Sequence, residues 1–276
     1  MNSNYVPKDI AEEVNVTPIN PLGNFAYLLG VVVSVTLALY LGLGWVAEQL
    51  VGRISPEMEV EIGRRVIPVQ ALERADRDEP RLDYVEDLLN SLRDRDSAQR
   101  APLTVRVLDE SIPNAGLFPG GHVVVTEGLL DSVQSENALA FVLAHELGHF
   151  EERDALRGLG RSLVFVMLAS ALGIGGSTAN SSAQVVSVTS QLAALRHSRR
   201  QEFTADEFAL AAVVDRYGHG DRSLDFFEHL LEQGHDKRVA DYFSTHPLTR
   251  DRIERLYRLA EERGWSMSGE VEPLPY

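Results

Sequence analysis

The sequence predicts a mainly helical α+β fold with a small β-sheet and one N-terminal transmembrane helix. Three observations lead to this prediction. Residues 25–46 form one uncharged and mostly apolar run, residues 138–144 are apolar on every side as in a buried helix, and residues 103–108 and 122–126 have the β-branched content of strands. A chain of 276 residues has room for one domain with a substantial core and an accessory segment.

The composition excludes several classes of protein. Acidic residues outnumber basic residues by 41 to 26, the net charge is −15, and no sustained basic run occurs, so no nucleic acid partner is expected. The chain has no cysteine, which excludes disulfides, thiolate metal ligands and a cysteine nucleophile. Any bound metal must therefore be held by histidine, aspartate or glutamate.

The N-terminus is predicted to be a polar tail over residues 1–23, followed by a transmembrane helix over residues 24–47. No formal charge occurs between Glu13 and Glu48. The 22 residues of the run 25–46 would reach roughly 33 Å, enough to cross a hydrocarbon core of about 30 Å. A cleaved signal peptide fits less well, because the run is too long and no small-x-small pattern follows it. We therefore expect an uncleaved anchor and a lipid bilayer as a partner.

The charges beside the span predict its orientation. Lys8 precedes the span, whereas Arg53, Arg64 and Arg65 follow it. The positive-inside rule then places the C-terminal part of the chain in the cytoplasm. Because acidic residues share the second flank, the periplasmic or lumenal side is the alternative.

Short helices and two strands are predicted after the anchor. Residues 48–100 are expected to form a helical accessory segment that packs on the main body of the chain. The predicted helices are 57–69, 82–92, 191–214, 224–231 and 247–262, the predicted strands are 103–108 and 122–126, and a predicted turn, 114–121, joins the strands. Pro247 suits a first helical position, and residues 264–276 are predicted to be a C-terminal tail.

A second uncharged stretch is too short to cross a membrane. Its apolar part, residues 163–174, is followed by a Gly/Ser-rich segment. We expect a buried helix that ends in a Gly/Ser loop. Contact of residues 163–175 with the membrane surface is the alternative.

Residues 145–149 read His-Glu-Leu-Gly-His, which predicts a metal site. On a helix, residues i and i+4 project from the same face, so His145 and His149 can hold one metal ion with Glu146 beside it. Ser135 can cap this helix, and its apolar lead-in favours a buried site over two surface histidines. The arrangement is typical of zinc hydrolases.

A third ligand is needed, because catalytic zinc takes three protein ligands and keeps a fourth position for water. Glu202 and Asp206 stand four residues apart on a predicted helix. Glu202 can then bind the metal while Asp206 accepts a hydrogen bond from a ligating imidazole. The alternative is a solvated acidic face paired with nearby arginines.

The chain resembles the M48 family of zinc metallopeptidases over about residues 57–260. The resemblance rests on four motifs in the right order, which are Asn114 to Gly121, His145 to His149, Ser198 to Asp206, and Ser244-Thr245-His246-Pro247 with Arg252-Ile253. It implies a zincin-like metallopeptidase domain over residues 101–263, with a small sheet edge beside the active-site helix. It also implies one zinc ion per chain, held by His145, His149 and Glu202, with Glu146 as the catalytic base. The single anchor departs from the family members that have several spans.

The resemblance and the anchor together predict a membrane-anchored zinc metalloendopeptidase whose substrates are misfolded or membrane-proximal proteins or peptides. Two alternatives stay open. One is a zinc-stabilised membrane adaptor or chaperone-like protein that does not cleave, although a purely structural zinc site would not need Glu146. The other is a latent protease in which His246 occupies the fourth metal position.

The remaining site candidates carry alternatives of their own. His246 could stabilise an oxyanion or bind the metal, or it could be a cap or a packed residue. Asn114, Gly120 and Gly121 could bind a substrate strand, or the glycines could simply form a turn. Arg252 could steady a carboxylate in the site or pair with an acidic residue of its own helix. The other histidines, which are His122, His197, His219, His229 and His235, are expected to be surface or structural residues.

Overall fold

A computed structural model describes residues 20–66, 75–76, 81–93, 102–171, 197–233 and 245–276. The chain divides into two compact units, residues 1–43 and 44–276. The helices in the described ranges are α1 Pro21–Val51, α2 Pro56–Val66, α4 Leu82–Ser91, α5 Glu127–Ser132, α6 Glu136–Glu151, α7 Asp154–Ala171, α9 Arg199–Tyr217, α10 Asp225–Gln233 and α12 Arg250–Arg263. The strands are β1 Ala75–Asp76, β2 Thr104–Leu108, β3 Ala115–Phe118 and β4 His122–Thr126. The predicted mainly helical fold with a small sheet is confirmed.

Helix α1 is long and apolar enough to cross a membrane, judged by its length and composition. It has 31 residues, and its most apolar window has a mean hydropathy of 2.1 with none of that window buried in the structure. Trp45, near its C-terminal end, is 64% exposed. Such an exposed apolar helix is typical of a membrane anchor. It extends beyond the predicted span of 24–47 at both ends.

The sheet in the described part of the second unit is mixed, with strand order β1-β2-β4-β3. β2 and β4 are parallel, with Val105 opposite Val123, whereas β3 is antiparallel to β4, with Ala115 opposite Val125. The prediction of one long turn over residues 114–121 was therefore wrong, because an edge strand occupies its first half. Ala-Gly-Leu-Phe lacks β-branched residues, so its strand conformation comes from pairing with β4 rather than from local propensity.

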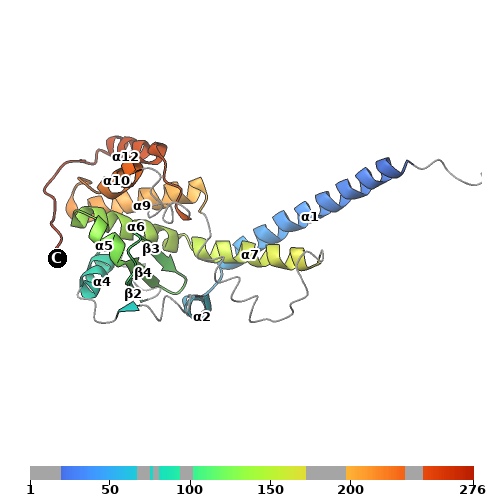
Figure 1. Ribbon diagram of the computed structural model, residues 1–276, viewed down its shortest axis with the longest axis horizontal. Coiled ribbons are helices and arrows are strands. Elements are labelled where there is room, and N and C mark those ends of the chain that lie inside the picture. Colours follow the sequence, from blue (N-terminus) through green and yellow to red (C-terminus); the bar gives the residue numbers. More distant parts are fainter. Residues whose placement is uncertain (1–19, 67–74, 77–80, 94–101, 172–196, 234–244) are drawn as a thin grey trace, which may run out of the picture. The chain divides into compact units, whose positions relative to one another are not determined.

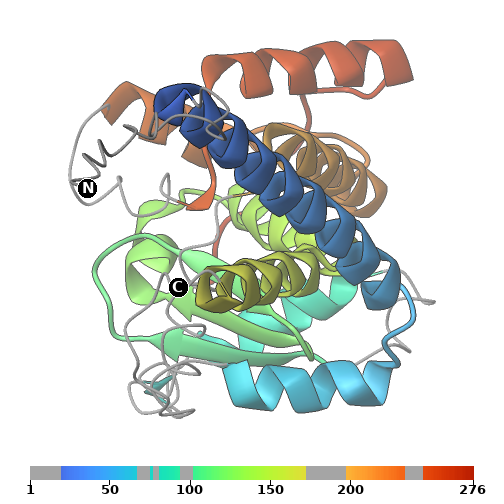
Figure 2. The same cartoon turned by 90° about the vertical axis from the view of Figure 1, so that its right-hand side faces the viewer.

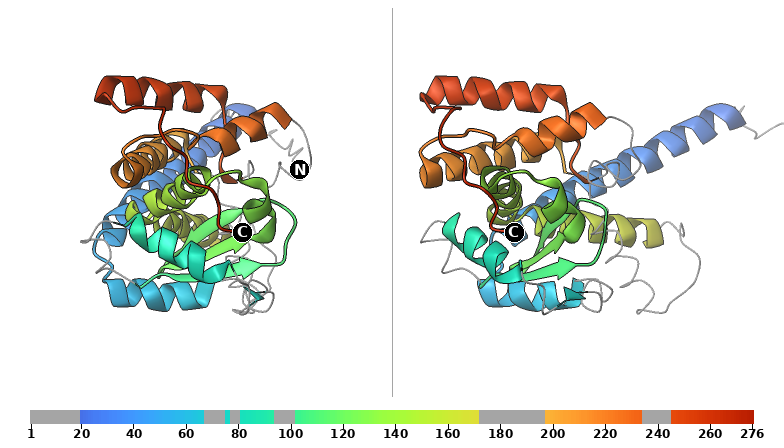
Figure 3. Two further views of the ribbon diagram at one scale, coloured as in Figure 1. Left: turned by 90° about the vertical axis from the view of Figure 1, so that its left-hand side faces the viewer. Right: turned by 60° about the vertical axis from the view of Figure 1, so that its left-hand side comes forward.

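Helix α6 forms the centre of the second unit. Every residue from Asn137 to Phe150 is buried, and the apolar run 138–144 predicted a buried helix here. The sheet contacts one side of α6 and α9 another, while α10 also contacts α6 and α12 contacts α9 and α10 (Figure 1). Helix α2 lies on the opposite side of the sheet from α6 (Figures 2 and 3). The helix therefore carries its polar motif into the interior of the molecule.

Local contacts fix the start of α6. The Ser135 hydroxyl accepts a hydrogen bond from the backbone N–H of Ala138 at 3.2 Å, which is the predicted cap. The Glu136 carboxylate accepts hydrogen bonds from the hydroxyls of Tyr84 and Tyr217, both at 2.6 Å. These contacts tie α4 and α9 to the start of α6. The apolar face of α4 joins the same core, and its buried residues are Val85, Leu88 and Leu89.

Two predicted helices differ from the structure. Helix α7 covers the described part of the second apolar stretch, but it is not buried on all sides, because Leu163 and Met167 are 45% and 67% exposed. Residues 172–175 and 191–196, where further predictions fall, lie outside the described residues. The last helix begins at Arg250 after the N-cap residue Thr249, so Pro247 is not its first residue.

Helices α6 and α9 approach each other closely at Gly148. A Cβ atom at this position would lie 2.8 Å from Cα of Ala205 on α9, a distance that real Cβ contacts do not reach. The close approach requires a residue without a side chain. It brings the motif of α6 against the acidic residues of α9.

Gly148→Ala is expected to lower the free energy of unfolding by about 1–3 kcal/mol, because the added methyl forces the two helices apart. Chemical denaturation of the full chain in detergent measures this. Gly44→Ala is the control, since a Cβ at this helical glycine meets nothing within 4 Å. An unchanged or increased unfolding free energy for Gly148→Ala would contradict the role given to the close approach.

Candidate metal centre

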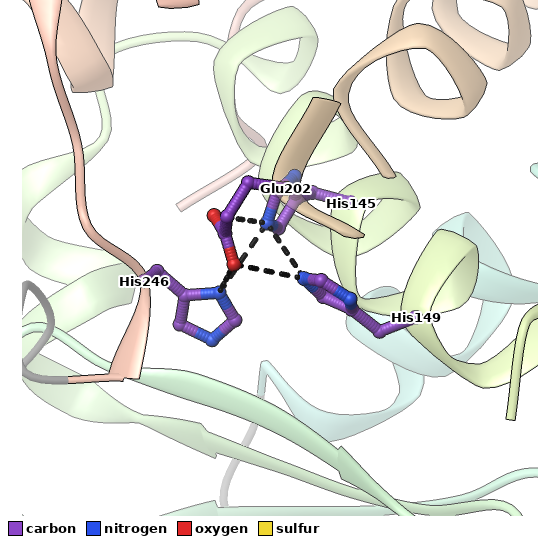
Figure 4. Close-up of side chains that lie close together, drawn as sticks. All are labelled: His145, His149, Glu202 and His246. Atoms are coloured by element: carbon purple, nitrogen blue, oxygen red, sulfur yellow. Dashed lines mark hydrogen bonds and ion pairs between the residues drawn. The ribbon is translucent and has the colours of Figure 1, made fainter. Parts of the chain in front are cut away.

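Four side chains from three parts of the chain converge at one point. His145 and His149 lie in the C-terminal half of α6, Glu202 lies in the first turn of α9, and His246 lies shortly before α12. Figure 4 shows the four side chains pointing toward one another. The exposed fractions are 0% for His145, 4% for His149, 1% for Glu202 and 3% for His246. The alternatives of surface histidines and a solvated acidic face are therefore wrong.

Several distances between the converging atoms are close to the edge lengths of a tetrahedral metal site. Zinc lies about 2.0–2.1 Å from nitrogen ligands, so two ligand atoms of a tetrahedron lie about 3.3–3.4 Å apart. Nε2 of His145 lies 3.2 Å from Nε2 of His149 and 3.5 Å from Oε2 of Glu202, and Nε2 of His149 lies 3.4 Å from Oε1 of Glu202. Nδ1 of His246 lies 3.2 Å from Oε1 of Glu202 and 3.4 Å from Nε2 of His145. These nitrogen and oxygen atoms fit one divalent cation such as zinc.

Asp206 contacts His145 on the side opposite this centre. Its Oδ1 lies 3.0 Å from Nδ1 of His145, the contact that the spacing of Glu202 and Asp206 predicted. A proton on Nδ1 leaves the lone pair of Nε2 directed at the other converging atoms. The tautomer that suits metal binding is therefore the one that Asp206 favours.

Arg252 contacts two carboxylates at the centre, which agrees with the first of the two roles predicted for it. It is 3% exposed, and its guanidinium lies 2.5 Å from Oε2 of Glu202 and forms two bonds to Asp206, at 2.7 and 2.8 Å. A further bond of 3.1 Å reaches the carbonyl oxygen of Pro247. The fork geometry of arginine suits two neighbouring carboxylates. Arg252 thus balances the negative charge of α9, and it pairs with α9 rather than with its own helix.

Two residues near the centre were not among the predicted site residues. The ring of His197 stacks on that of His149, with ring centroids 3.8 Å apart, and lies 5.1 Å from that of His246. The Asp154 carboxylate lies 2.9 Å from Nδ1 of His149. The sequence held weak signals for both, because His197 directly precedes the motif that contains Glu202 and Asp154 closely follows the pentapeptide.

A cavity of about 180 Å³ lies beside the converging side chains. It is lined by Glu146, His149, His197 and His246 together with β3 and Asn114. Glu146 is 3% exposed, and its Oε1 lies 3.5 Å from Nε2 of His246. The carboxylate of the motif therefore borders both the metal centre and a space next to an edge strand.

Gly120 and Gly121 are not part of this lining. Both have positive φ angles, 83° and 82°. A Cβ at Gly120 would lie 2.8 Å from Cα of Val60, and one at Gly121 would overlap the carbonyl oxygen of Pro102. The turn and its close packing on the chain itself require these glycines. The turn alternative accounts for both residues.

The charges of the centre shift several pKa values. Burial opposes protonation of the histidines, but hydrogen bonds to Asp154 and Glu202 prevail and raise the pKa of His149 to about 9. Hydrogen bonds to Asp206 and Glu202 likewise raise the pKa of His145 against the effect of burial. Burial also opposes ionisation of Glu202, yet the three surrounding imidazoles hold its pKa below the usual range. The site attracts positive charge, which protons supply where no metal does.

Comparison with known sequences agrees with this geometry. Residues 80–260 match peptidase family M48. The chain belongs to this family. The predicted resemblance is confirmed, and the enzyme class is that of a metallopeptidase.

Proteases similar to this M48 chain come from several organisms. It is 32% identical over 154 residues to a mitochondrial metalloendopeptidase of Arabidopsis thaliana. This match covers 55% of this chain and 30% of that protein. It is 27% identical over 186 residues to a putative beta-barrel assembly-enhancing protease of Vibrio cholerae. This match covers 62% of this chain and 37% of that protein. A protease HtpX homolog of Thermococcus kodakarensis is 31% identical over 212 residues. This match covers 62% of this chain and 73% of that protein. The chain thus spans only about a third of the first two proteins.

Arg252→Met in this M48 chain is expected to lower the free energy of unfolding by about 3–5 kcal/mol, because it leaves two buried carboxylates without their cation. Arg255→Met on the same helix is the control. Its partner Glu207 is 42% exposed, so a loss of about 1 kcal/mol or less is expected. Chemical denaturation measures the free energy of unfolding of both variants. Equal losses would show that the buried ion pairs of Arg252 stabilise the fold no more than the exposed pair of Arg255.

The metal-free protein is expected to lose stability as the pH rises. The pKa of His149 is about 9 in the folded state, against 6.5 for an unperturbed histidine. Its stabilising contribution is therefore complete below about pH 6.5 and is lost as the pH rises through about 9. Thermal unfolding of chelator-treated protein should give a lower Tm at pH 9 than at pH 6.5, with a smaller difference when zinc is bound. A metal-free Tm that rises over this interval would contradict the assignment.

Proposed function

We propose that the chain is a membrane-anchored zinc metalloendopeptidase that cleaves misfolded or membrane-proximal proteins. One observation carries this proposal. The cluster of His145, His149, Glu202 and His246 borders the same cavity as the Glu146 carboxylate. A metal and a general base beside a cavity are parts that peptide hydrolysis needs. A purely structural metal site would not need Glu146.

His145, His149 and Glu202 are the proposed metal ligands, with one zinc ion per chain. Zinc held there would supply a Lewis acid that lowers the pKa of a water molecule and polarises the scissile carbonyl. Glu146 would accept the proton of that water and pass it to the leaving amine. Asp206 would hold His145 in the metal-binding tautomer, and Arg252 would hold Oε2 of Glu202.

Strand β3 is the proposed binding edge for the substrate. It ends the described sheet, pairs only with β4 there, and lines the cavity. An extended peptide could add to this edge through backbone hydrogen bonds. The backbone N–H of Asn114 donates to the Thr126 hydroxyl at 2.8 Å, so Asn114 would contact substrate through its side chain rather than through that N–H.

A latent state is the second candidate, and the position of His246 favours it. Nδ1 of His246 lies within 3.4 Å of ligand atoms of both His145 and Glu202. A fourth protein ligand would fill the position that water needs in the active enzyme. His246 would then have to leave the centre before cleavage, or it would stabilise the oxyanion once displaced.

The membrane limits the proposed substrates. Helix α1 would keep the catalytic domain near a bilayer, and similar proteins include a beta-barrel assembly-enhancing protease and HtpX homologs. The charge bias around the span supports a cytoplasmic catalytic domain, with the periplasmic or lumenal side as the alternative. We place the catalytic domain over residues 101–263, with α4 of the accessory segment contributing to its core.

Glu146→Gln is expected to lower cleavage of a fluorescently labelled unfolded protein by at least about 100-fold, because the general base is lost. Zinc content of the full chain in detergent should stay unchanged. Glu152→Gln, an exposed change just beyond α6, is the control and should cleave like the wild type. Full activity of Glu146→Gln would contradict the proposed mechanism.

His246→Ala separates the two candidate states. If His246 closes the site, cleavage of the same protein rises in this variant, whereas an oxyanion role predicts a loss of about 100-fold. Zinc is retained in both cases through the other three ligands. If neither the wild type nor this variant cleaves while both hold zinc, the non-cleaving adaptor is the better description.

A further inference from the structure

Asp154 lies at the start of α7 and contacts His149 on the side opposite the metal centre. Its Oδ2 lies 2.9 Å from Nδ1 of His149, and Asp154 is 2% exposed. The chain turns between the two residues at Arg153, whose φ of 54° is rare for a residue with a side chain. The Arg153 guanidinium donates to the carbonyl oxygens of Val51 and Ile54, both at 2.9 Å, which holds this turn in place.

Gln201 contacts the other oxygen of Asp154. Its Nε2 lies 2.6 Å from Oδ1 of Asp154, while its Oε1 lies 2.9 Å from the backbone nitrogen of Ser198. The chemistry of the partners fixes this amide orientation, because a backbone N–H can only donate and a carboxylate can only accept. Arg157 is a weaker neighbour, 3.8 Å from Oδ1 and 34% exposed.

We propose that Gln201 and Asp154 form a hydrogen-bond relay that fixes His149 in the tautomer and orientation for metal binding. The backbone N–H of Ser198 donates to Gln201, Gln201 donates to Asp154, and Nδ1–H of His149 donates to the second oxygen of Asp154. Each step sets the polarity of the next. The last step leaves the lone pair on Nε2 of His149, the atom that faces Glu202 and His145.

The relay also explains why a helix cap lies next to a metal ligand. Ser198 and Gln201 form a capping box at the start of α9, and Glu202 follows immediately. The same glutamine side chain therefore caps the helix that carries Glu202 and orients the ligand His149 on α6. Asp154 and Gln201 are positioning residues, since both act on the metal through His149. The inference rests on the proposed metal site, but a metal affinity tests it without any cleavage.

Asp154→Asn is the first test. An amide has one acceptor and one donor where the carboxylate has two acceptors, so a donor must face either His149 or Gln201. We expect zinc binding to weaken by about 10–100-fold. The measurement is competition with a chromogenic chelator, using the full chain in detergent, with the visible spectrum of the cobalt-substituted protein as a second readout. Affinity within about twofold of the wild type would overturn the relay.

The double variant Asp154→Asn with Gln201→Glu restores the pairing with the two groups exchanged. The new amide would donate to the new carboxylate and accept from His149, and the capping box is retained because glutamate also serves in it. We expect the double variant to bind zinc at least about threefold more tightly than Asp154→Asn does. This would recover part of the 10–100-fold loss of affinity. If zinc affinity does not recover in the double variant, the relay is overturned and Asp154 makes a local contact only.

Ser198→Ala is the matched control. It removes the hydroxyl that accepts from the backbone N–H of Gln201 at 3.3 Å but keeps the Ser198 N–H that begins the relay. The Tm should fall through loss of the cap, while zinc affinity stays within about twofold. If Asp154→Asn does not fold, Gln201→Met replaces it, and zinc affinity equal to that of Ser198→Ala would overturn the relay. A wild type and a His246→Ala variant that both bind zinc tightly without cleaving would contradict the proposed function alone.

Discussion

The close approach of α6 and α9 at Gly148 is the constraint on which the rest of the structure depends. A helix that is buried from Asn137 to Phe150 carries two histidines and a glutamate, and the neighbouring helix presents Glu202 and Asp206 to it. No side chain separates the two backbones there, since a Cβ at Gly148 would meet Ala205. The polar residues must therefore satisfy one another or share a cation.

Charge balance follows from this burial. Asp154, Glu202 and Asp206 are buried carboxylates, and Arg252 compensates two of them directly. Buried charges are tolerated only when they are paired or bind metal, so the histidines must take up a proton or a cation. The pKa values of His145 and His149 are raised because the buried carboxylates stabilise their protonated forms. Metal binding at these residues would therefore be coupled to folding, because the same residues would serve both.

Local patterns in the sequence predicted the parts of the site that lie on single helices. The i, i+4 spacing placed His145 with His149, and the apolar lead-in placed them in the core. Strand β3 was missed because it contains no β-branched residue, and the own-helix alternative for Arg252 failed because its partners lie on another helix. His197 and Asp154 contact the centre because separate segments pack together. The spacing of residues within one segment does not predict such contacts. Helical spacing put Glu202 forward as a third ligand, and family resemblance favoured it over the solvated face that its local charge pattern alone indicated.

X-ray absorption at the zinc edge of the purified full chain would test the central claim most directly. The geometry predicts one zinc ion in a four-coordinate shell of nitrogen and oxygen atoms at about 2.0–2.1 Å, with two imidazoles in the open site and three when His246 is bound. His145→Ala should abolish this signal. A six-coordinate shell of oxygen atoms at longer distances, or zinc content that does not change in His145→Ala, would contradict the claim that these side chains enclose the metal.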